Sequence, residues 1–204
     1  RRLDALRSDL GTLDCAVIAS FHNTYYLSGH PMVPWGRMAI VIVPADGDAT
    51  GVLPNFERSA AAENSPITDF RTYTDEGESA LEEALRLTVE VLREQGAGLV
   101  GIEAEGVSAA TLEALGRRFP EGSFEDITSL VDGLRIVSSE EEIAIIRKAT
   151  EVADLGLLTL MDGPFLGEAE AVVADRCCSA MNSALAARYP ELYGTADAYL
   201  QQGV

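Results

Sequence analysis

The chain has 204 residues, with 15 basic and 33 acidic side chains and a formal charge of −18. This length suits one domain, or one domain and part of a second, and a hydrophobic content of 47% excludes a disordered chain. The excess of acid argues against nucleic acid or an anionic membrane as a partner, because both would repel the surface. The three cysteines are too few for a disulfide framework, and no apolar run is long enough to span a bilayer, so we expect a cytoplasmic protein.

The first part of the chain alternates between helical and strand patterns. Leucines at helical spacing open the chain, and residues 78–95 and 108–119 carry the same kind of apolar face. Short apolar runs bounded by turn residues predict strands over residues 15–19, 38–43, 50–53 and 99–102. Strand–helix alternation of this kind is typical of a layered α/β domain, which we place at residues 1–133.

The pattern changes after residue 133. Ser138 with Glu141, and Ser139 with Glu142, form two overlapping capping boxes that predict a helix start, and this helix ends near residues 162–164. A second amphipathic helix is predicted over residues 167–189. Two such helices need a further partner to bury their apolar faces. We therefore expect residues 134–204 to be the start of a second domain whose sheet lies beyond Val204.

Neither end of the chain carries the tail or helix-cap signal of a natural terminus. The sequence opens at Arg1 inside a helical pattern, without a methionine, and stops at Val204 in what resembles the start of a strand. We therefore expect the sequence to be a piece of a longer protein.

Polar and aromatic side chains are concentrated over residues 20–30 and 34–37, between two predicted buried strands. We interpret this stretch as a loop, and loops at strand ends often carry binding sites. Trp35 and Arg37 flank Gly36, and an aromatic plane beside a guanidinium suits a small flat ligand with a carboxylate. The alternative is that Trp35 fills a gap in the core and Arg37 pairs with a surface acid.

The stretch from Asn23 to Gly29 resembles the N-x-x-Y-[LY]-[ST]-G motif of the creatinase and Xaa-Pro dipeptidase family, the pita-bread hydrolases with an added N-terminal domain. Residues 136–149 resemble the joint into the catalytic domain of that family. Within the family the chain looks closest to the creatinase members, through residues 20–23 and 35–37. The resemblance implies a ribonuclease-H-like α/β domain with a mixed sheet over residues 1–133. It also implies that residues 134–204 are a linker and the first two helices of an incomplete pita-bread α+β domain.

The resemblance to creatinase implies a C–N hydrolase that acts on a small carboxylated guanidino or amide compound, as in the conversion of creatine to sarcosine and urea. It also implies a homodimer in which Trp35 and Arg37 reach the partner subunit's pocket. There Trp35 would stack on the substrate and Arg37 would pair with its carboxylate. Trp35 replaces the phenylalanine of creatinase, and the sequence also differs at Gly29 and His30.

No residue of this chain matches a catalytic position of the family. Residues 199–203 resemble the segment just before the catalytic histidine of creatinase, which acts as an acid–base group without a metal. Metal-dependent relatives bind two divalent ions such as Mn through two Asp, one His and two Glu, and none of those positions falls in this sequence. We therefore expect the catalytic residues beyond Val204, and an inactive fragment.

Two alternatives to a creatinase-like hydrolase stay open. One is a metal-dependent Xaa-Pro dipeptidase, in which the N-terminal domain limits the length of the substrate. The other is a non-catalytic module for substrate gating and dimerisation.

Overall fold

The computed structural model describes residues 1–31, 37–74, 79–163, 165, 167–192, 194 and 196–198. They fall into two compact units, Arg1–Val137 and Ser138–Val204. Helix α6 (Thr128–Ile136) runs through the boundary expected at residue 133. Just before its start, the carboxylate of Asp126 accepts from the backbone N–H and the hydroxyl of Thr128.

The first unit is an α/β domain. Its strands are β1 (Cys15–Ile18), β2 (Ile40–Pro44), β3 (Thr50–Pro54), β4 (Asp69–Tyr73), β5 (Leu99–Ile102) and β6 (Ser123–Asp126). Its other helices are α1 (Arg2–Asp9), α2 (Phe21–Ser28), α3 (Arg58–Asn64), α4 (Ala80–Glu94) and α5 (Ala109–Arg118), with short 3₁₀ turns η1 (Asn55–Glu57) and η2 (Ala104–Gly106).

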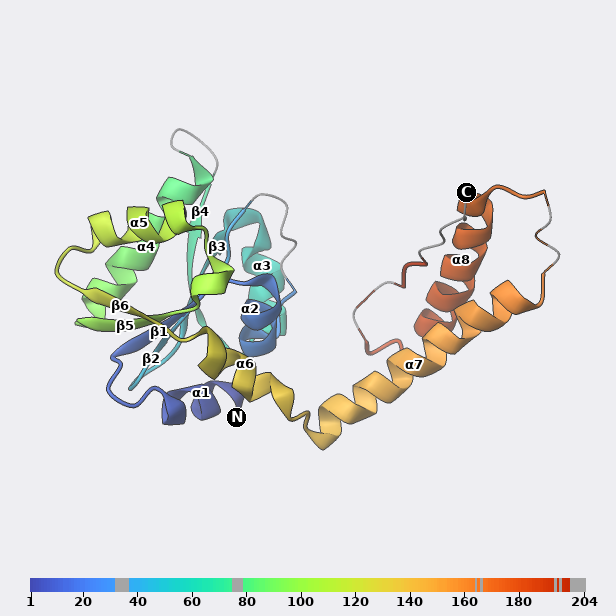
Figure 1. Cartoon of the computed structure of the whole chain (residues 1–204), viewed down its shortest axis with the longest axis horizontal. Coiled ribbons are helices and arrows are strands. Elements are labelled where there is room, and N and C mark those ends of the chain that lie inside the picture. The colour runs from blue at the N-terminus through green and yellow to red at the C-terminus, as the bar shows by residue number, and fades with distance from the viewer. Residues whose placement is uncertain are drawn as a thin grey trace. The chain divides into compact units, whose positions relative to one another are not determined.

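The six strands form one mixed sheet in the order β4-β3-β2-β1-β5-β6 (Figure 1). The pairs β1–β5, β5–β6 and β3–β4 are parallel, whereas β2 is antiparallel to both of its neighbours. Five strands therefore end at one edge of the sheet, and β2 begins there. This arrangement confirms the ribonuclease-H-like fold that the resemblance implies.

Helices cover both faces of the sheet, so the domain has three layers (Figure 1). Side chains alternate along β1: Cys15 and Val17 point into a core shared with α4 and α5, whereas Ala16 and Ile18 point into a core shared with α1, α2 and α6. Burial in the first core raises the pKa of the Cys15 thiol to about 11, so this cysteine stays protonated at neutral pH.

The prediction of a loop from residue 20 onward is wrong in its first part, because residues 21–28 form helix α2. The hydroxyl of Ser20 accepts a hydrogen bond from the backbone N–H of Asn23 and caps the start of the helix. Gly29 has φ 74° and ends the helix by donating to the carbonyl of Tyr25. These two caps outweigh the weak helix propensity of the β-branched and aromatic residues between them.

The second unit contains α7 (Glu140–Met161) and α8 (Glu170–Arg188). Of the two capping boxes predicted, the structure forms the one between Ser139 and Glu142. Val152 packs with Cys177 and Met181 of α8, and Gly156 lets Met181 approach the backbone of α7 closely. Apolar side chains elsewhere on α7 stay exposed, among them Ile146 and Leu157. Among the described residues, no helix is both long and apolar enough to cross a membrane.

Gly101 of β5 lies against the core that the sheet shares with α1, α2 and α6, and there is no room for a side chain at this position. A Cβ atom there would lie 2.8 Å from Ile127 Cγ2 and 2.9 Å from Leu13 Cδ1, so we expect Gly101→Ala to lower the free energy of unfolding by about 1–3 kcal/mol. Gly116 lies inside α5 with nothing within 4 Å of an added Cβ. Gly116→Ala should therefore raise the free energy of unfolding by about 0.5–1 kcal/mol. Urea unfolding followed by circular dichroism tests both, and equal stability of Gly101→Ala and the wild type would contradict the packing argument.

Candidate functional site

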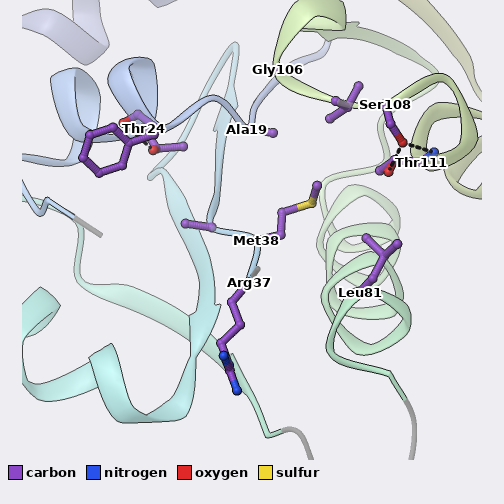
Figure 2. A pocket seen from close by; sticks show the side chains of 11 residues that line it. Ala19, Thr24, Arg37, Met38, Leu81, Gly106, Ser108 and Thr111 are labelled. Atoms are coloured by element: carbon purple, nitrogen blue, oxygen red, sulfur yellow. Dashed lines mark hydrogen bonds between the residues drawn. The ribbon is translucent and has the colours of Figure 1, made fainter. Parts of the chain in front are cut away.

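A cavity of about 380 Å³ opens at the edge of the sheet where β1 and β5 end and β2 begins (Figure 2). This is within the size range of small-molecule sites, and the carboxyl ends of parallel strands are where α/β folds place them. The described residues that line it are Ala19, Phe21, Thr24, Arg37, Met38, Ala39, Leu81, Gly106, Val107, Ser108 and Thr111. Most of the lining is apolar.

Arg37 is the only charged residue among the described residues that line the cavity. It is exposed, and its guanidinium carbon lies 5.8 Å from the centre of the Phe56 ring. In Figure 2 the side chain of Met38 points toward Leu81 and Ser108, whereas that of Arg37 extends the other way. The guanidinium is therefore presented at the edge of the domain. Trp35, the other predicted binding residue, lies outside the described residues.

The hydroxyls that line the cavity are all engaged within the domain: that of Thr24 donates to the carbonyls of Ser20 and Phe21, and those of Ser108 and Thr111 contact each other. Ser108 Oγ accepts from the backbone N–H of Thr111 at 3.1 Å and lies 2.8 Å from Thr111 Oγ1, as the dashed lines in Figure 2 show. Ser108 is thus the N-cap of α5. These groups shape the wall of the cavity, and Arg37 supplies its charge.

A buried carboxylate lies behind the cavity. Glu103 follows β5 and is 2% exposed. Its Oε2 accepts from the backbone N–H groups of Ala19 at 3.1 Å and Ser20 at 2.9 Å, and its Oε1 accepts from Asn23 Nδ2 at 2.5 Å. The carboxylate therefore joins the end of β5 to the end of β1 and the first turn of α2. Sequence reasoning did not single out Glu103, although an acidic residue directly after a buried strand was a signal for it.

The network continues to the last helix of the domain. Asn23 is 2% exposed, and its Oδ1 accepts from Arg135 Nη1 of α6 at 3.0 Å. Gly106 covers the other side, where a Cβ atom would lie 2.7 Å from the nitrogen of Ser20 and 2.9 Å from Glu103 Oε2. A glycine is required at this position because any side chain would collide with the carboxylate and its donors.

A second carboxylate organises the neighbouring strand end. Asp126 Oδ1 accepts from the hydroxyl and the backbone N–H of Thr128 and from the backbone N–H of Ala104. These donors, Thr128 first, hold the pKa of Asp126 below its ordinary value. The Asp126 carboxylate therefore has a structural role. Among the described residues, no group of three or more His, Cys, Asp or Glu side chains could hold a metal ion.

Residues 1–137 match the family described as the creatinase/prolidase N-terminal domain. The chain belongs to the creatinase/prolidase family. Its sequence is 31% identical to a Xaa-Pro dipeptidase from Pyrococcus furiosus over 169 residues, which is 81% of this chain and 43% of the relative. It is 25% identical to a creatinase from a Bacillus species over 185 residues, which is 87% of this chain and 43% of that relative.

The fold agrees with solved structures of the family. The prolidase from Pyrococcus horikoshii superposes with a TM-score of 0.72 at 23% identity, over 89% of this chain and 48% of that one. The chain thus spans less than half the length of these relatives.

In this creatinase/prolidase domain, the motif from Asn23 to Gly29 serves the fold. Asn23 binds Glu103, and Tyr26 Oη donates to the carbonyl of Leu134 at 2.9 Å. Leu27 is buried in the core, and Gly29 ends α2. The motif that identifies the family is therefore the set of contacts that holds α2 in place.

The Glu103 network predicts a stability defect for a change that removes only the charge. In Glu103→Gln an amide NH₂ must face either the backbone donors of residues 19 and 20 or the amide of Asn23, so we expect a loss of about 1–3 kcal/mol in the free energy of unfolding. Glu105→Gln, at an exposed position two residues later, is the matched control and should be close to wild type. Urea unfolding measures both, and equal stability of the two variants would contradict the role of the carboxylate.

Proposed function

We propose that the full-length protein containing this chain is a hydrolase that cleaves a C–N bond in a small substrate with a free carboxylate, with Xaa-Pro dipeptides as the first candidates. The observation that carries this proposal is the similarity to the dipeptidase of P. furiosus across 81% of the chain. Because the chain corresponds to 43% of that relative, we place the catalytic groups in the remainder of the full-length protein. The 204-residue chain alone should be inactive.

Arg37 is the residue of this chain that we assign to substrate binding. A guanidinium presents a planar pair of N–H donors that matches a carboxylate. Arg37 is exposed and extends away from the other lining residues of its own cavity, which supports a role toward a neighbouring subunit. We therefore infer a homodimer in which Arg37, together with Trp35, serves the partner subunit's pocket.

Creatine is the second candidate substrate. It is supported by the similarity to the Bacillus creatinase over 87% of the chain and by the two stretches, residues 20–23 and 35–37, that resemble creatinase. The identity is lower than with the dipeptidase, 25% against 31%, and this difference places creatine second. The two reactions also differ in chemistry, since the resemblance implies divalent ions for the dipeptidase and none for creatinase.

The first test is hydrolysis by the full-length protein of a Xaa-Pro dipeptide and of creatine, each with and without a chelator. We expect dipeptide cleavage that the chelator abolishes and added Mn²⁺ restores. Chelator-resistant release of urea from creatine would instead establish the second candidate. Turnover of either substrate by the 204-residue chain alone would contradict the placement of the catalytic groups.

The second test is Arg37→Ala in the full-length protein. Loss of a desolvated arginine–carboxylate pair typically costs about 2–5 kcal/mol, so we expect kcat/KM to fall roughly 30-fold to several thousand-fold. Arg58→Ala removes an exposed arginine at the start of α3 and should leave kcat/KM unchanged. Light scattering should give a dimer for both variants. A fully active monomer would contradict the role of Arg37 across the interface.

A further inference from the structure

The residue next to Arg37 is held by a buried tyrosine. Tyr73 ends β4, and its side chain is 3% exposed in the core that α4 and α5 share with the sheet. Its hydroxyl donates to the carbonyl of Met38 at 2.7 Å and accepts from the N–H of Met38 at 3.0 Å. One side chain therefore binds both backbone groups of one residue.

These two hydrogen bonds lie outside the strand ladder. Strand β2 begins pairing with β3 at Ile40, two residues after Met38. Among the described strand pairs, the backbone of Met38 therefore has no partner, and it is the Tyr73 hydroxyl that binds it. A phenylalanine would fill the same space in the core, but it would leave the carbonyl and N–H of Met38 unsatisfied where they are now paired.

A second contact to this part of the chain comes from η1, the turn that follows β3. Phe56 of η1 places its ring 5.8 Å from the guanidinium carbon of Arg37, and it is 69% exposed. The adjacent Glu57 accepts from His30 Nε2 at 2.8 Å, and both of these side chains are largely buried. The 3₁₀ turn η1 and the end of β4 thus contact His30, Arg37 and Met38.

We propose that Tyr73 and Phe56 are positioning residues for Arg37: Tyr73 fixes the backbone beside it, and Phe56 restrains its guanidinium by a cation–π contact. This inference rests on the proposed function, in which Arg37 binds a substrate carboxylate. Recognition of a carboxylate by two parallel N–H donors depends on placement to within about 0.5 Å, and a long side chain on an unanchored backbone would lose much of that precision.

The test uses Tyr73→Phe in the full-length protein, with Tyr26→Phe as the matched control. Tyr26 also donates to a backbone carbonyl in the same domain, but that carbonyl belongs to Leu134, far along the chain from Arg37. We expect Tyr73→Phe to raise KM for the carboxylate substrate roughly three- to tenfold, while kcat changes less than about twofold. KM for the carboxamide analogue of the same substrate should not change. Tyr26→Phe should leave both KM values at wild type.

A combined variant separates this inference from the proposed function. In an Arg37→Ala background, Tyr73→Phe should raise KM no further, because the hydroxyl acts through Arg37. If Arg37→Ala itself leaves KM unchanged, the proposed role of Arg37 fails and the positioning role falls with it. If Arg37→Ala raises KM and Tyr73→Phe does not, the positioning role alone is overturned. A fall in kcat that is equal for both substrates would likewise overturn it.

Phe56→Leu provides a second measurement if Tyr73→Phe does not fold. The ring is exposed, so its loss should leave the melting temperature of the protein unchanged. We expect KM for the carboxylate substrate to rise about two- to fivefold, as the loss of an exposed cation–π contact would give. An unchanged KM would overturn the proposal.

Discussion

The buried carboxylate of Glu103 is the interaction on which this edge of the domain depends. A charge that is 2% exposed is stable only when donors surround it, and here they come from the end of β1, the first turn of α2 and the side chain of Asn23. The network fixes the direction in which the chain leaves β1. Helix α2 must then pack on one face of the sheet, which closes the cavity on that side.

The antiparallel direction of β2 determines which residues lie at this edge of the sheet. Because β2 runs antiparallel to both of its neighbours, it begins at the same edge at which β1 and β5 end. Arg37 and Met38 therefore lie beside residues that follow parallel strands. A strictly parallel sheet would have sent them to the opposite edge. The mixed sheet thus brings a charged side chain to a position where the fold itself provides an apolar cavity.

Much of the architecture could be predicted from sequence, because β1, β2, β3 and β5 are apolar runs and α4 and α5 have clear apolar faces. The outermost strands of the sheet, β4 and β6, were not predicted. Residues such as Arg71 and Glu125 make them polar, and half-exposed strands show only a weak hydrophobic pattern. Helix α2 was missed for a different reason: its stability comes from Ser20, Gly29 and Glu103. The contact of Tyr73 with Met38 could not be predicted, because it joins residues 35 apart through a fold that places them together.

Under the proposed function, the residues that stabilise this domain differ from the residue that binds the substrate. In this chain the motif from Asn23 to Gly29 binds Glu103, ends α2 and packs in the core, so its residues serve the fold. Such a motif identifies the family without indicating the substrate. Substrate selectivity then depends on side chains outside this motif. Under the proposed function one such side chain is Arg37, which lies beside the backbone that Tyr73 binds and contacts the ring of Phe56.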